Sequence, residues 1–139
     1  MERNTIDEPA YKLAYKFRRI LVPIAPTERS LNSIEVARDF YHRYGSKIVF
    51  FYVSQAGEDE NRVREFLSKY ANDIPYELKI EKLKNNETIA SMIINEINNE
   101  FYDLIIVESR GLTGAQALLY NSISAIIALT APTSVLILR

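Results

Sequence analysis

The sequence predicts an α/β domain built on a five-stranded, mostly parallel, doubly wound sheet with helices on both faces. Three observations lead to this prediction. Short apolar runs alternate along the chain with segments whose apolar residues recur at helical spacing. Most of the runs lack the alternation of a half-exposed strand, as expected for strands that are covered on both faces. Right-handed crossovers with short connections then make a doubly wound strand order the simplest arrangement.

The first half of the chain predicts two strands, each followed by a helix. Ile20–Ile24 and Ile48–Val53 are short apolar runs, and the second is dense in β-branched and aromatic residues. The helix between them has apolar residues at helical spacing, Asn32 as its predicted cap, Glu35 three residues later and a glycine at its end. The same spacing over Val63–Tyr70 predicts the second helix, with acidic residues at its start that are expected to be solvated.

The second half predicts three further strands and two helices. Tyr76–Lys82 alternates strictly, which suits a half-exposed strand near a sheet edge. The third helix is expected to begin after Asn85 and Asn86, which places Glu87 in its first turn. The remaining strand, helix and strand are predicted at Leu104–Val107, Ile123–Thr130 and Ser134–Leu138. Residues 1–17 are interpreted as an N-terminal extension and residues 18–139 as one domain.

Composition narrows the range of functions. The 139 residues are 47% apolar and 25% charged with a net charge of -1, which gives no overall attraction to nucleic acid or anionic lipid. No basic stripe with interleaved aromatic residues is present, so no nucleic-acid partner is predicted. The chain has no cysteine and one histidine, which excludes disulfides and zinc–thiolate sites and leaves no metal-ligand set to predict.

The hydropathy pattern predicts a cytoplasmic protein without direct membrane insertion. No apolar run approaches the ~18 residues that a membrane-spanning helix needs. The N-terminus also lacks the apolar region of a signal peptide.

The candidate binding site follows from the predicted strand order. In a doubly wound sheet, ligands bind beyond the carboxyl ends of the strands, where the strand order reverses. Glycines and hydroxyl groups near the predicted start of the last helix suit an anion, because free backbone N–H groups and the helix dipole favour negative charge. The alternative is that these glycines form turns and Ser122 caps the helix. The candidate residues are Ala25, Thr27, Val53, Glu108, Arg110, Gly111, Gly114, Asn121, Ser122 and Ser124.

Several motifs together resemble the universal stress protein family over roughly residues 18–139. They are Ile20–Pro23, Val53, Asp103–Val107, Ser109–Gly111 and Ala131–Pro132. Nucleotide-binding members carry glycine, two residues, glycine, nine residues, glycine, then serine or threonine. The matching positions here are Glu108, Gly111, Asn121 and Ser122. The resemblance implies a Rossmann-like, adenine-nucleotide alpha-hydrolase-like fold, ATP or another adenine nucleotide with Mg²⁺ as ligand, and a role in stress resistance.

The chain departs from this signature at positions that matter for binding. ATP-binding members usually have an aspartate just after the first strand, where this chain has Ala25 followed by Pro26. Glu108 replaces a glycine, and unit charges ~4 Å apart repel by about 4 kcal/mol at an effective dielectric of ~20. Glu108 is expected either to pair with Arg110 in the phosphate position or to help hold Mg²⁺. The resemblance thus implies adenine-nucleotide binding that is weakened, altered or lost altogether.

The leading functional hypothesis is a regulatory or ligand-sensing module of the stress response rather than an enzyme. The sequence offers no nucleophile, base and oxyanion donors together. Family members often pair their last strand across a two-fold axis, so a homodimer through Val135 and Ile137 is expected. One alternative is a cytosolic regulatory domain related to a membrane transporter, because such domains often begin with a basic-aromatic segment like Tyr15–Arg19. Another is a slow ATP-hydrolysing switch that depends on Ser122.

Overall fold

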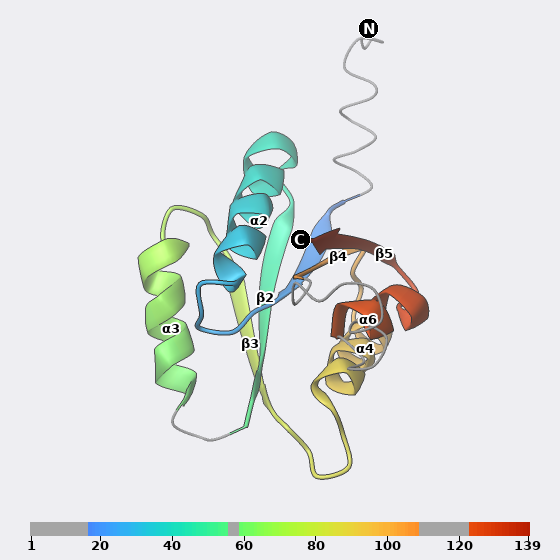
Figure 1. Ribbon diagram of the computed structural model, residues 1–139. Helices are drawn as coiled ribbons and strands as arrows, with labels where there is room; N and C mark the ends of the chain where they lie inside the picture. The colour runs from blue at the N-terminus through green and yellow to red at the C-terminus, as the bar shows by residue number, and fades with distance from the viewer. Residues whose placement is uncertain (1–16, 56–58, 109–122) are drawn as a thin grey trace, which may run out of the picture.

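The computed structural model describes residues 17–55, 59–108 and 123–139, which form five strands and four helices (Figure 1). The strands are β1 (Arg19–Pro23), β2 (Lys47–Ser54), β3 (Glu77–Lys82), β4 (Leu104–Glu108) and β5 (Ser134–Leu138). The helices are α2 (Ser30–Tyr44), α3 (Asp59–Tyr70), α4 (Ile89–Asn99) and α6 (Ile123–Thr130). The strand order is β3-β2-β1-β4-β5 and all four pairings are parallel, which confirms the predicted doubly wound sheet.

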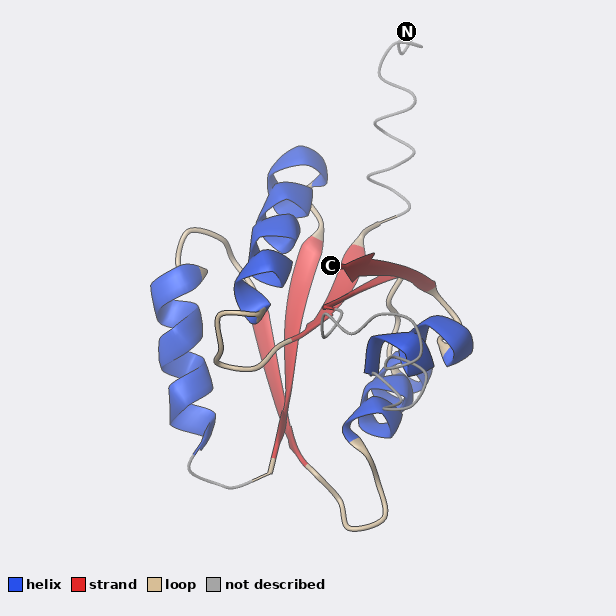
Figure 2. Ribbon diagram, viewed as in Figure 1, coloured by secondary structure: helices blue, strands red, loops and turns tan. Residues whose placement is uncertain are grey.

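Helices cover both faces of the sheet (Figure 2). Successive strand residues point to opposite faces, so Phe50 packs in the core beneath α2 and α3 while Phe51 packs beneath α4 and α6. In β4, Ile106 packs on the face covered by α2 and α3, and Ile105 packs on the face covered by α4 and α6. Both side chains are fully buried. Two separate apolar cores therefore hold the helices on the two faces and fix the positions of the strand ends.

The two edge strands differ in character. β3 is the edge strand that its alternation predicts, with exposed Glu77 and Glu81 on one side and half-buried Leu78 and Ile80. β5, at the other edge, is apolar apart from its first residue, and Ile137 is 38% exposed. Charge protects an edge from pairing with another chain, and β5 lacks that protection.

Two predicted helix starts were wrong. α2 begins at Ser30, two residues before Asn32, and Arg29 occupies its cap position without a side-chain hydrogen bond. The turn before it is closed instead by the Ser30 and Leu31 N–H groups, which donate to loop carbonyls (3.0 Å each). α4 begins at Ile89, because Thr88 and Ser91 form a reciprocal capping box. Glu87 therefore lies before the helix and accepts a hydrogen bond from the Ser91 hydroxyl (2.6 Å).

Asp103, which precedes β4, forms hydrogen bonds with the start of β1. Its two carboxylate oxygens accept hydrogen bonds from the backbone N–H groups of Arg18 (2.9 Å) and Arg19 (3.1 Å). Phe17, at the end of the predicted extension, packs edge-on against Phe40 of α2 with ring centroids 5.7 Å apart. Within the described ranges, no helix is long and apolar enough to cross a membrane.

Candidate functional site

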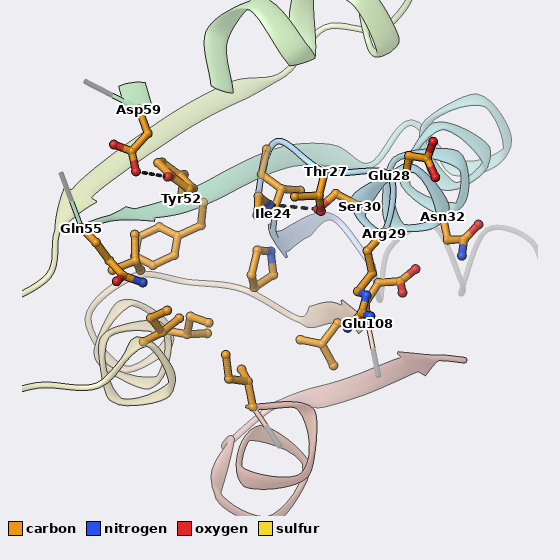
Figure 3. Close-up of a pocket in the computed structure, with 18 residues that line it drawn as sticks. Ile24, Thr27, Glu28, Arg29, Ser30, Asn32, Tyr52, Gln55, Asp59 and Glu108 are labelled. Carbon is orange, nitrogen blue, oxygen red and sulfur yellow. Dashed lines mark hydrogen bonds between the residues drawn. The ribbon is translucent and has the colours of Figure 1, made fainter. Parts of the chain in front are cut away.

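A cavity of about 950 Å³ opens beyond the carboxyl ends of β1, β2 and β4 (Figure 3). The chain leaves β1 toward α2 on one face of the sheet, while the helix that follows β4 in the described chain, α6, lies on the other face. The strand order reverses at this point, which is where open α/β sheets bind ligands. The described lining residues are Pro23, Ile24, Ala25, Thr27, Glu28, Arg29, Ser30, Asn32, Phe51, Tyr52, Val53, Gln55, Asp59, Ile89, Ile93, Val107, Glu108 and Ile123.

The structure brings together four of the residues that the sequence suggested for the site. Ala25, Thr27, Val53 and Glu108 all line the cavity. Ser124 is buried in α6 and is not part of the lining. The other five suggested residues lie outside the described residues; they are Arg110, Gly111, Gly114, Asn121 and Ser122.

The loop between β1 and α2 uses three of its backbone donors, those of Ala25, Thr27 and Ser30, internally. The Ala25 N–H donates to the Ser30 hydroxyl oxygen (2.9 Å), and the Thr27 N–H donates to the Ala25 carbonyl (2.8 Å). Pro26 has no N–H group. The Ser30 N–H is also occupied, since it donates to the Thr27 carbonyl (3.0 Å). These groups are therefore committed to holding the turn and do not point into the cavity as an anion-binding nest.

One end of the cavity is formed by Tyr52 and Asp59, which sequence reasoning missed. The Tyr52 hydroxyl donates to an Asp59 carboxylate oxygen (2.6 Å), so β2 is joined to the start of α3 (Figure 3). Burial, followed by this hydrogen bond, raises the pKa of Tyr52 to about 12. Asp59 was expected to be solvated at a helix start, but it is half-buried and bonded to the tyrosine. No spacing in the sequence indicates this contact.

The other end is formed by Arg29 and Glu108. Figure 3 shows the Arg29 side chain extending from the start of α2 toward Glu108 at the end of β4. Glu108 Oε2 is buried and accepts no hydrogen bond from the described part of the chain. A buried carboxylate oxygen without a donor costs free energy, so this atom is suited to a donor that a ligand brings. A basic residue in the loop after the first strand was the signal that could have drawn attention to Arg29.

Acidic side chains outnumber basic ones in the described lining. Glu28, Asp59 and Glu108 contribute carboxylates, and Arg29 contributes the cationic group. Among the described residues, no group of three or more histidine or carboxylate side chains is arranged to hold a metal ion. Between the two polar ends the wall is apolar, with Ile24, Val53, Ile89, Ile93 and Ile123.

The sequence profile of the universal stress protein family matches residues 16–139, nearly the whole chain. The chain belongs to the universal stress protein family. The family resemblance carried by the strand motifs is thereby confirmed. No curated protein matches the sequence significantly.

Solved universal stress protein structures share the fold. One in complex with cAMP has 17% identity and a TM-score of 0.75, covering 88% of this chain and 97% of the other. One from Archaeoglobus fulgidus DSM 4304 has 17% identity and a TM-score of 0.73, covering 100% of this chain and 48% of the other. One from Archaeoglobus fulgidus in complex with dAMP has 14% identity and a TM-score of 0.64, covering 88% and 98%. At these identities the likeness establishes the fold.

Proposed function

We propose that this universal stress protein domain is a cytoplasmic, ligand-sensing regulatory module of the stress response that binds an adenine nucleotide without turning it over. The observation that carries the proposal is the cavity at the point where the strand order reverses. Its volume of about 950 Å³ falls within the range of small-molecule sites. Its apolar wall between two polar ends suits a flat base with a polar sugar and phosphate.

The structural neighbours support an adenine ligand. Two of the family structures that share the fold are complexes with cAMP and dAMP. Both ligands combine an adenine base with a single phosphate group. In this chain, Ile24 and Val53 offer an apolar surface for the base, and Tyr52 lies beside them.

Turnover has little support in the described lining. These residues include no histidine, lysine or cysteine. The Ser30 hydroxyl oxygen already accepts the Ala25 N–H, and the Tyr52 hydroxyl already donates to Asp59. A tyrosine whose pKa is raised to about 12 stays protonated at neutral pH and is then a weak nucleophile. We therefore expect phosphate release from ATP to remain at background.

Isothermal titration of the full chain with AMP, and with ATP in the presence and absence of Mg²⁺, tests the binding. We expect saturable binding at one site per chain. The Ala25→Asp variant restores the family's usual aspartate and should tighten binding, because a carboxylate can accept hydrogen bonds from the base or ribose. Ser68→Asp adds the same charge on the exposed face of α3 and is the matched control. No binding of any adenine compound by either the wild type or Ala25→Asp would refute the proposal.

The proposal includes a homodimer through β5. The strand forms an edge of the sheet, and Val135 and Ile137, two residues apart, lie on the same face of that apolar edge, where a second β5 can cover them. Leu129 of α6, the helix that precedes β5, is also an exposed apolar residue, at 86%. Native mass spectrometry of freshly purified protein reports both the oligomer and any nucleotide that co-purifies. A monomer at micromolar concentration would count against the dimer.

A further inference from the structure

We propose that a network of charged and aromatic side chains between α4 and the sheet fixes the position of this helix and, through it, one wall of the cavity. Ile89 and Ile93, in the first half of α4, line the cavity. The network is centred on the second half of the same helix, and its positioning residues include Lys79, Glu96 and Tyr102. These residues set the shape of the cavity whichever ligand fills it, so their role does not depend on adenine-nucleotide binding.

Glu96 is at the centre of the network. Its carboxylate oxygen Oε2 accepts hydrogen bonds from the Lys79 ammonium group (2.7 Å) and from the Tyr102 hydroxyl (2.6 Å). The Glu96 side chain is 10% exposed and Tyr102 is buried, so water competes little for these bonds. Burial, followed by the hydrogen bond to Glu96, raises the pKa of Tyr102, so its hydroxyl remains a donor. Glu96 therefore joins α4 both to β3 and to the segment that precedes β4.

Arg19, at the start of β1, extends the network to a third strand. Its Nη1 donates to the Phe101 carbonyl (3.0 Å), and its guanidinium lies over the Tyr102 ring, 4.6 Å from the ring centroid. Glu100, one turn after Glu96, forms ion pairs with Arg19 (3.7 Å) and with Lys79 (3.8 Å). The last turn of α4 is thus held by cations from both β1 and β3.

The network and the cavity wall lie on one stripe of α4. Ile89, Ile93, Glu96 and Glu100 are spaced by four, three and four residues, which places them on the same side of a helix. The stripe is apolar where it lines the cavity and acidic where it meets the cations of the sheet. Any rotation or axial shift of α4 that carries Glu96 away from its donors therefore also displaces the two isoleucines from the cavity.

The network suits a role in position more than a role in stability. Removing a carboxylate and an ammonium group from water costs free energy that offsets their attraction, and replacing such a pair by apolar side chains of similar volume is often neutral or stabilising. Apolar packing of Met92, Ile93 and Ile97 holds α4 against the sheet, but this attraction has no preferred direction. The hydrogen bonds to Glu96 have required lengths and directions, so they are satisfied at one position of the helix.

Distance measurement between spin labels tests the position of α4 directly. The chain has no cysteine, so introduced cysteines can carry nitroxide labels at chosen positions. Asn95→Cys in α4 and Ser68→Cys in α3 are exposed sites on helices that cover opposite faces of the sheet. Double electron–electron resonance then gives the distribution of distances between the two helices. A second pair, His42→Cys in α2 with Ser68→Cys, lies wholly on the other face and is the control pair.

The deciding variant is Lys79→Met/Glu96→Leu/Tyr102→Phe, which fills the site with apolar groups of similar size. We expect its urea midpoint to equal or exceed that of the parent, while the distance distribution between positions 95 and 68 becomes at least about twofold broader. The distribution between positions 42 and 68 should not change. Asp39→Leu/Arg43→Met removes an ion pair of 2.9 Å from the exposed surface of α2 and should leave both distributions unchanged.

Each outcome decides the inference. Broadening confined to the pair that includes α4 supports it, whether or not the urea midpoint changes. A distribution between positions 95 and 68 as narrow as that of the parent would show that apolar packing alone positions α4, and would overturn it. Equal broadening of both pairs would assign the network to general stability and would also overturn it. If the triple variant does not fold, Glu96→Gln removes the charge at nearly constant shape and is judged by the same two distributions.

Discussion

Replacing Tyr52 by phenylalanine tests whether the Tyr52–Asp59 hydrogen bond holds one wall of the cavity. The bond joins the end of β2 to the first turn of α3 at 2.6 Å. A hydrogen bond to a charged group contributes about 1.5–3 kcal/mol to stability. Asp59 is half-buried and regains water when the hydroxyl is lost, so we expect a loss near the lower end, about 1.5 kcal/mol. The apolar packing of the ring is retained in phenylalanine.

Urea denaturation followed by circular dichroism measures this loss, and a double-mutant cycle with Asp59→Ala isolates the pair. We expect a coupling free energy of about 1 kcal/mol between positions 52 and 59. Glu60 is the matched control, because it is also half-buried in the first turn of α3 and no hydrogen bond joins it to Tyr52 among the described contacts. The cycle of Tyr52→Phe with Glu60→Ala should be additive.

The same pair predicts a pH dependence. The pKa of Tyr52 is raised to about 12 in the folded protein, above the ordinary tyrosine value of about 10. The folded state therefore holds the phenolic proton more tightly than the unfolded state does. The resulting stability is present in full below about pH 10 and is lost as the pH rises toward 12. Wild type should lose stability relative to Tyr52→Phe across this interval.

Two results would contradict this account of the cavity wall. The first is a Tyr52→Phe variant whose stability lies within about 0.3 kcal/mol of wild type, with no coupling to Asp59 beyond experimental error. The second is a stability difference between wild type and Tyr52→Phe that does not change from pH 9 to pH 12, since an unperturbed tyrosine at position 52 would behave in that way.

Three further predictions address the fold and the assembly. Ile106→Ala removes a fully buried side chain from the interior strand β4 and should lower the free energy of unfolding by about 2–5 kcal/mol in urea denaturation. Thr88→Ala removes the hydroxyl that accepts the Ser91 N–H at the start of α4 and should cost about 1 kcal/mol in the same assay, whereas Thr88→Ser should retain most of the stability. Ile137→Lys places a charge on the β5 edge and should convert a dimer to a monomer in light scattering; Phe101→Lys, which also replaces an exposed apolar side chain but outside β5, should leave the dimer intact.

The strands and their faces were predictable because the signal is local. Ile20–Ile24 and Leu104–Val107 are apolar without alternation, and the structure places both in interior strands of the sheet. Tyr76–Lys82 alternates, and its strand lies at an edge with one side exposed. A strand covered on both faces is apolar throughout, whereas a strand covered on one face alternates between apolar and polar residues. The pattern therefore predicts whether a strand lies in the interior or at the edge of the sheet.

The first residue of each helix was harder to predict from the sequence, because several residues near the start can form the helix N-cap. Asn32 and Glu35 fit a capping pattern, but the turn closed by the Ser30 and Leu31 N–H groups starts the helix earlier. Thr88, and not one of the asparagines before it, is the N-cap of α4, because Thr88 and Ser91 form the two hydrogen bonds of a capping box. The competition between such residues is decided by backbone geometry that sequence spacing does not contain.

The sequence by itself determined the fold class, the family and the edge of the sheet at which a ligand would lie, because hydrophobic periodicity and strand motifs are properties of short segments. Only the tertiary structure decided that Tyr52 bonds to Asp59, that Arg29 extends toward Glu108, and that a Glu108 oxygen is buried. Arg29 and Glu108 are 79 positions apart in the chain and line the same cavity because β1 and β4 are hydrogen-bonded neighbours in the sheet. Contacts of this kind depend on strand order and packing, which no local pattern records.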